Sequence, residues 1–298
     1  MTRLVQPIDR TQPASPAKPS GFTQGLKYRM IATNWPARIE WLTSGQTGFL
    51  VYWAVLIGIA MLELRLPGPR PQHSLGPRLK VNLMFGLIAA VLFSIPFLST
   101  IAVAQVVTQR GWGLIGAFDW PLWLRVLFSF VAMDLAGYAI HRLSHVWSPL
   151  WRIHRVHHTD NDIDLSTLFR AHPAAVVVTT LLEFVVIVAL GLHPLGIMAH
   201  GLARLATMAF GHANVTSHPR LSRLLSAVLV TPNFHRMHHS AWQPETDSNY
   251  GEVLTLWDRL FGSVSRSAGP IERFGLGDAF DHDAAAPLGQ LKLPFVSR

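Results

Sequence analysis

Long apolar stretches constrain the fold of this chain more than any other feature of its sequence. Only 14% of the 298 residues are charged, against about a quarter in an average soluble domain. Uncharged stretches of about 20 residues are typical of helices that cross a bilayer, where every backbone polar group must be bonded within the helix. The sequence therefore predicts an all-α integral membrane bundle with four or five spans, at residues 48–64, 81–109, 121–140, 173–192 and 194–210.

Proline and charge modify this expectation at two places. The span 81–109 is longer than one crossing needs, and Pro96 inside it predicts a kink or a break, because proline cannot donate a backbone hydrogen bond.

Glu183 and Arg204 lie at similar distances from the turn at His193, so they reach similar depths if the last two spans form a hairpin. This favours a structural ion pair over a polar lining for a lipid headgroup or channel. Such a hairpin could also enter the bilayer without crossing it fully.

The distribution of charge indicates the orientation of the bundle. Arginines concentrate in the loop 65–80 and in the segments that follow His141. The positive-inside rule places these segments in the cytoplasm. The net charge of +8 has the same explanation, because no basic stripe interleaved with aromatic residues indicates nucleic-acid binding. The chain has no cysteine, which excludes disulfides, cysteine-ligated iron–sulfur clusters and thiolate-ligated haem.

Eight histidines form three clusters with the spacing of metal ligands. The clusters are H-x-x-x-H at 141–145, H-x-x-H-H at 154–158 and H-x-x-H-H at 235–239. Residues three or four positions apart lie on one face of a helix, within reach of a common ion. Neutral imidazole suits zinc, iron, copper and nickel, and the number of histidines exceeds the four ligands of one tetrahedral zinc. We therefore expect two metal ions, in preference to surface histidines on basic loops.

The order and spacing of these clusters resemble the fatty acid hydroxylase/sterol desaturase superfamily. Further motifs extend the resemblance over residues 125–263: Asp134-x3-Tyr138-x2-His141-Arg142, the segment from Thr167 to Pro173, His212-x-Asn214, Ser248-Asn249-Tyr250-Gly251 and Trp257–Gly262. The resemblance implies a membrane-bound, non-haem oxidoreductase that uses two irons and O2 to hydroxylate or desaturate an unactivated C–H bond of a lipid or sterol-like substrate. No haem- or flavin-binding segment is visible, so an external ferredoxin, cytochrome or reductase is the expected electron donor.

The resemblance also implies a ligand set and neighbouring residues. The expected metal ligands are His141, His145, His154, His157, His158, His172, His212, His235, His238 and His239. Among them, His172 could instead only support a ligand. Residues expected to contact the ligands are Asp134, Tyr138, Asn249 and Tyr250. Asp134 could equally have a structural role, whereas for Asn249 and Tyr250 contact with the site is favoured over a simple turn motif.

The expected organisation has three parts: a polar arm at 1–45, a membrane catalytic domain at 46–263 and a tail at 264–298 without a recognisable motif. Two alternatives remain open. A carotenoid or ether-lipid hydroxylase would have the same metal site and a different pocket. A non-catalytic metal-binding membrane protein, such as a transporter, would place histidines and acidic residues inside its spans. Here the clusters lie at the ends of spans and between them, which favours the enzyme.

Overall fold

The computed structural model describes residues 45–216, 218–267, 271–277 and 286–296. In these ranges the regular elements are α-helices and 3-10 helices, and the β pairing consists of isolated bridges. The predicted all-α class is therefore confirmed for this part of the chain. The expectation for the polar arm at 1–45 lies outside the described residues, apart from residue 45.

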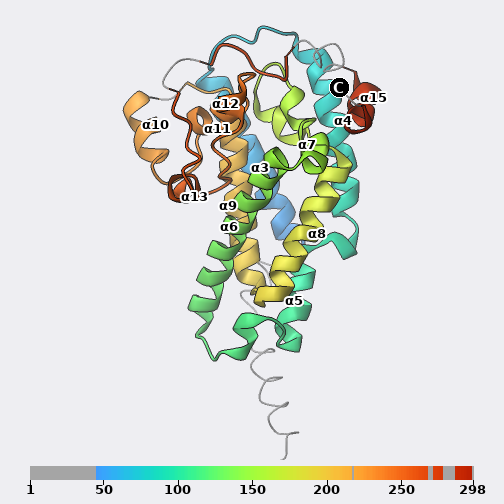
Figure 1. Cartoon of the computed structure of the whole chain (residues 1–298), viewed down its shortest axis with the longest axis vertical. Helices are drawn as coiled ribbons and strands as arrows, with labels where there is room; N and C mark the ends of the chain where they lie inside the picture. Colours follow the sequence, from blue (N-terminus) through green and yellow to red (C-terminus); the bar gives the residue numbers. More distant parts are fainter. Residues whose placement is uncertain (1–44, 217, 268–270, 278–285, 297–298) are drawn as a thin grey trace, which may run out of the picture. The chain divides into compact units, whose positions relative to one another are not determined.

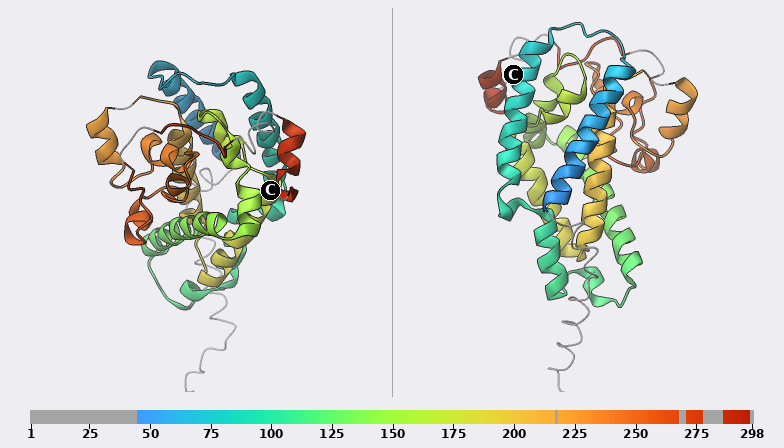
Figure 2. Two further views of the ribbon diagram at one scale, coloured as in Figure 1. Left: turned by 45° about the horizontal axis from the view of Figure 1, so that its top comes forward. Right: turned by 180° about the vertical axis from the view of Figure 1, so that it is seen from behind.

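Long helices run alongside one another and form a bundle (Figures 1 and 2). They are α3 (Gly45–Arg65), α4 (Leu75–Phe93), α5 (Thr100–Arg110), α6 (Leu122–Val146), α8 (Pro173–Leu190) and α9 (Pro194–His212). Among the described residues, 4 segments are long and apolar enough to cross a membrane, namely Thr47–Arg65 and the helices α4, α6 and α8. Helix α9 carries Arg204 and His200 within its length and is not in this set.

The predicted single span at 81–109 is wrong, although the predicted break near Pro96 is confirmed. Helix α4 begins earlier than expected and ends at Phe93, a short 3-10 turn covers Pro96–Leu98, and α5 begins at Thr100. The hydroxyl of Ser99 accepts a hydrogen bond from the backbone N–H of Ala102 and so caps α5. Because α5 has only 11 residues, it is too short to cross a bilayer alone.

Short helices gather at one end of the bundle, beyond the last turns of α6 and α9 (Figure 1). These elements are α7 (Ser148–His154), the 3-10 turns His157–Thr159 and Leu165–Phe169, α10 (Pro219–Leu225), α11 (Pro232–His238), α12 (Gln243–Thr246) and α13 (Leu256–Leu260). Most of the α-helices among them have proline in the first turn, where its missing N–H costs no intrahelical bond. This layer and the ends of α6 and α9 carry all three histidine clusters.

The end of the chain packs on this layer. Helix α15 (Pro287–Lys292) and the turn Leu293–Phe295 lie beside α4 and α7. Leu293 is buried against Val81, Phe85 and Val156. The guanidinium of Arg155 donates to the Leu293 carbonyl at 2.6 Å. The segment at 264–298, in which the sequence shows no motif, therefore includes a part that supports the second histidine cluster.

Candidate metal centre

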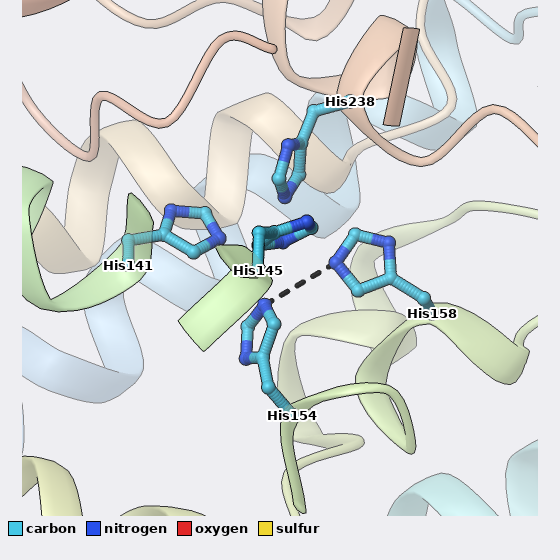
Figure 3. A group of neighbouring side chains, drawn as sticks. All are labelled: His141, His145, His154, His158 and His238. Atoms are coloured by element: carbon cyan, nitrogen blue, oxygen red, sulfur yellow. Dashed lines mark hydrogen bonds between the residues drawn. The ribbon is translucent and has the colours of Figure 1, made fainter. Parts of the chain in front are cut away.

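The structure brings nine histidines together in two adjacent groups. The first group contains His141, His145, His154, His158 and His238, and the second contains His157, His212, His235 and His239. Within each group one nitrogen of every ring lies within 4.8 Å of the others. Figure 3 shows the five rings of the first group pointing toward a common space. The two groups adjoin one another, since the rings of His158 and His239 stack with centroids 4.6 Å apart.

Four segments that are distant in sequence supply these side chains. Helix α6 continues beyond the predicted span end at 140 to Val146, and so it carries both histidines of the first cluster on one rigid helix. The second cluster begins at the last residue of α7 and continues through the following 3-10 turn. His212 is the last residue of α9, and the third cluster lies on α11 and at its end. Gly211 allows α9 and α11 to approach closely, because a Cβ there would lie 3.1 Å from the Cβ of His235.

Backbone carbonyls fix the tautomers of several rings. The Nδ1 of His141 lies 2.8 Å from the Tyr250 carbonyl, and the Nδ1 of His238 lies 2.7 Å from the Ser248 carbonyl. A carbonyl only accepts, so each of these Nδ1 atoms carries the proton and each Nε2 carries a lone pair. Both Nε2 atoms are buried without a hydrogen-bond partner. Buried lone pairs without partners, aimed into a shared space, are what metal coordination requires.

In the second group, two nitrogen lone pairs lie close to each other. The Nδ1 of His157 donates to the Arg170 carbonyl at 3.0 Å, and the Nδ1 of His212 donates to the Met208 carbonyl at 2.8 Å. Both Nε2 atoms therefore carry lone pairs, yet they face each other at 3.1 Å. Two acceptors at this distance repel one another unless a cation lies between or beside them. The donor set of this group therefore fits a bound metal ion.

Burial keeps these imidazoles neutral. Desolvation lowers the pKa of His154, His157, His158, His235, His238 and His239 well below its ordinary value, and neighbouring histidines lower it further. A neutral imidazole is the form that binds a metal. The nitrogen-only donor set suits iron, zinc, copper or nickel and does not suit magnesium or calcium, which prefer oxygen.

A buried ionic network supports the second cluster from α4. The Nε of Arg78 lies 2.5 Å from Oδ1 of Asp160, whose Oδ2 accepts from Asn82 and Thr167. The side chain of Arg170, whose carbonyl holds His157, donates to Asn82 at 2.7 Å. Sequence reasoning missed this network, because its members are about 80 residues apart and no local pattern connects them.

Of the other residues expected at the site, His172 lies outside both histidine groups, whereas Tyr250 contacts the first group. The structure does not bring His172 into either group; it caps α8, accepting from the Ala174 N–H at 3.1 Å, and its Nε2 lies 3.2 Å from the Leu291 carbonyl. Asn249 has a left-handed backbone with φ of 54° and donates to the Phe234 carbonyl. Tyr250 contacts the site twice, through its carbonyl and through its ring, which lies 5.2 Å from that of His145.

Asp134 and Tyr138 form hydrogen bonds with residues outside the two histidine groups. Asp134 accepts from the indole N–H of Trp257 at 2.8 Å. The hydroxyl of Tyr138 lies 2.8 Å from the Ser263 hydroxyl and accepts from Arg142. Sequence reasoning also missed Asp247, whose carboxylate lies 3.2 Å from Nδ1 of His145 and can accept a hydrogen bond from it.

The predicted ion pair between Glu183 and Arg204 is confirmed. The two side chains are 2.9 Å apart, and Glu252 makes a second ion pair with Arg204 at 2.9 Å. Glu252 was not expected from the sequence. Its carboxylate occupies the space beside Gly137, where a Cβ would lie 2.4 Å from Oε2. The resulting triad joins α8 and α9 to the segment that follows Tyr250.

Comparison with known proteins shows that the segment containing this centre is similar to a known family. The model of the fatty acid hydroxylase family matches residues 126–263, a segment that contains all nine grouped histidines. Residues 126–263, a little under half of the chain, are therefore similar to the fatty acid hydroxylase family. The predicted resemblance is thereby confirmed. Helix α4 and the segment 286–296, which support the second histidine cluster, lie outside the matched residues.

Three curated proteins illustrate the similarity. An ornithine lipid hydroxylase of Rhizobium tropici is 31% identical over 160 residues, covering 51% of this chain and 45% of that protein. The human alkylglycerol monooxygenase is 30% identical over 135 residues, covering 45% and 29%. A fatty acid hydroxylase of Lecanicillium is 29% identical over 182 residues, covering 55% and 49%. The chain therefore spans less than half the length of each of these relatives. No solved structure matches the chain significantly.

Proposed function

We propose that this protein is a membrane-bound, O2-dependent, non-haem di-iron enzyme that hydroxylates a C–H bond of a lipid. The observation that supports this most directly is the pair of nitrogen-only groups. In the first group the Nε2 atoms of His141, His145 and His238 are buried without a protein partner, and in the second group Nε2 atoms face one another. Similarity to lipid hydroxylases and to alkylglycerol monooxygenases supports the reaction class. The family match covers the segments that bear the grouped histidines. The printed activities of the relatives favour hydroxylation over desaturation.

In this proposal the first group holds one iron and the second group holds the other. When bound, the irons would supply the activation of O2 and the removal of hydrogen from carbon. The chain's own contribution is to hold the rings. The carbonyls of Tyr250, Ser248, Arg170 and Met208 retain the Nδ1 protons and so keep every opposing Nε2 available. Burial of the rings excludes bulk water, which protects a reactive site from side reactions.

The proposal includes a location and an electron donor. The four apolar helices would span the membrane, and the arginine-rich ends that carry the histidines would lie in the cytoplasm. A soluble reductase, ferredoxin or cytochrome would then supply two electrons per turnover at this face. The layer of short helices would form a cytoplasmic cap over the lipid-embedded part of the bundle.

Similarity to alkylglycerol monooxygenases favours an ether lipid as one specific candidate substrate. Similarity to an ornithine lipid hydroxylase favours an amino-acid-containing lipid as another. Both are lipids with a polar headgroup, and both would enter from the bilayer.

The deciding experiment combines metal analysis with turnover. Protein purified in detergent after growth on iron-57 should contain about two irons per chain, with the Mössbauer signature of a magnetically coupled pair. With reductant, a lipid extract and 18O2, it should consume oxygen and incorporate one 18O atom into a lipid. The variant His157→Ala should lose both properties. As a matched control, His218→Ala alters an exposed histidine at the start of α10 and should retain them. Fully metal-loaded protein that consumes no oxygen would contradict the proposal and favour a non-catalytic metal protein.

A further inference from the structure

A groove of about 300 Å³ lies on the outer face of α6, beside the first histidine group. Four apolar side chains of α6 line it, and Phe261 closes it from the segment after α13; the four are Leu135, Ala139, Leu143 and Val146. Tyr138 and Arg142 complete its lining. The groove lies along the last three turns of a helix that is long and apolar enough to cross a membrane. It is therefore accessible from the bilayer if α6 spans it.

Helix α6 carries the apolar residues of the groove on one face and two histidines on another. The four apolar residues recur at intervals of four, four and three positions, which places them on one stripe. His141 and His145 lie on a different face and belong to the first metal group. At 100° per residue, Tyr138 and Arg142 lie between the stripe and the histidines. These two residues therefore form the boundary between the groove and the metal centre.

Three aromatic rings, those of Phe261, Tyr138 and Tyr250, form a barrier between the groove and the first histidine group. The Tyr138 ring stacks on Phe261 with centroids 5.5 Å apart, and only 3% of its surface is exposed. The Tyr138 ring also lies edge-on to the Tyr250 ring, with centroids 6.2 Å apart. The Tyr250 ring in turn contacts His145 at 5.2 Å and His238 at 5.8 Å. Phe261 is 48% exposed, so the outer part of this barrier faces the groove's opening.

The polar end of the groove is cationic. Arg142 is exposed, and its guanidinium donates to the Tyr138 hydroxyl at 3.1 Å, so its charge lies at the edge of the barrier. The lining contains no acidic residue. An apolar trough with one cation at its edge is complementary to a hydrocarbon chain that carries an anionic headgroup.

We infer that this groove binds one chain of an anionic bilayer lipid, with the headgroup at Arg142 and the chain along Leu135 and Ala139, and that it is the lipid's entry to the first metal group. The statement that this anionic lipid is the substrate rests on the proposed function. Displacement of Phe261 and Tyr138 would admit the chain toward Tyr250. The binding step itself requires no metal and no turnover.

The absence of native cysteine allows a direct test of binding. A single Ala139→Cys variant is labelled with bimane in nanodiscs of phosphatidylcholine, and the fluorescence is quenched with either brominated phosphatidylglycerol or brominated phosphatidylcholine. The anionic lipid should reach half-maximal quenching at about a fivefold lower mole fraction, the effect of one arginine near a lipid surface. Arg142→Gln should remove this preference, and Arg142→Lys should retain most of it.

The matched control is Leu127→Cys, an exposed position on the same helix outside the groove. It should show no preference between the two brominated lipids. Equal quenching by both lipids at position 139 would overturn the inference, as would a preference that survives Arg142→Gln or occurs equally at position 127. Because quenching requires no iron, it separates the two proposals: a protein that shows the preference but does not oxidise lipid retains the groove and refutes only the proposed function.

A kinetic measurement links the groove to turnover. Arg142→Gln should raise KM about fivefold for an anionic lipid substrate, with a smaller change in kcat and little change in KM for a neutral one. An equal rise in KM for neutral and anionic lipids would contradict the assignment of Arg142 to the headgroup.

Discussion

His157 and His212 face each other through Nε2 atoms that are 3.1 Å apart, while the Nδ1 atom of each donates its proton to a backbone carbonyl. The contact brings together two lone pairs in a buried site, so the metal-free fold contains a repulsion that a bound cation would relieve. A ligand that binds only the folded state stabilises it by mass action. The histidine groups therefore link metal occupancy to the stability of the layer of short helices.

We expect chelation to lower the melting temperature of the purified protein, and iron to restore it. At a metal concentration of 100 times Kd the stabilisation is about 2.7 kcal/mol for one site. His212→Ala should reduce the iron content from about two to about one per chain, because it removes one ligand of the second group only. Differential scanning fluorimetry and metal analysis test both statements. An unchanged melting temperature on chelation would contradict the link.

The metal-free protein should lose stability as the pH falls below about 6.5. Burial lowers the pKa of histidines such as His158 and His239 in the folded protein, whereas the same side chains titrate near 6.5 in the unfolded chain. Between the lowered pKa and 6.5 the unfolded chain binds more protons, so the free energy of unfolding decreases as the pH falls. Each such histidine contributes up to about 1.4 kcal/mol per pH unit within that window.

Melting temperatures of the metal-free protein between pH 5 and 8 measure this dependence. Stability should be nearly constant above pH 7, where the histidines are neutral in both states. His158→Ala should flatten the slope below pH 6.5, while His218→Ala, which alters an exposed histidine, should leave it unchanged. A melting temperature that rises as the pH falls below 6.5 would refute the argument.

The ionic triad formed by Glu183, Arg204 and Glu252 should tolerate loss of one carboxylate better than loss of the cation. Arg204→Met would leave two buried carboxylates facing one another without a counter-charge, and breaking a buried pair in this way costs about 3–5 kcal/mol. Glu183→Gln keeps the second ion pair and a hydrogen-bonding side chain, so its cost should be smaller, about 1 kcal/mol. Thermal unfolding in one detergent compares the two variants. Equal losses would show that the triad does not act as a unit.

The sequence revealed the clustered histidines better than it revealed the residues that support them. Histidines at intervals of three and four are visible without a structure, and nine of the ten predicted ligands lie in the two groups. His172 lies outside them, because the following Pro173 begins α8 and makes His172 the helix cap, a signal present in the sequence. By contrast, Tyr250 acts on His141 through its backbone carbonyl, a contact that no side-chain pattern encodes.

The network around Asp160 provides the last prediction, because it joins the second histidine cluster to α4, which lies outside the residues matched by the family model. Asp160→Asn should weaken the bond to Arg78 and the attraction to Arg170, whose carbonyl holds His157. We expect a lower iron content and a changed Mössbauer spectrum of one iron, since ligand orientation typically alters metal affinity 10–100-fold. Asp119→Asn alters an exposed carboxylate between α5 and α6 and serves as the control. If Asp160→Asn lowers only the melting temperature, with iron content and spectrum unchanged, the network stabilises the fold without positioning the ligand.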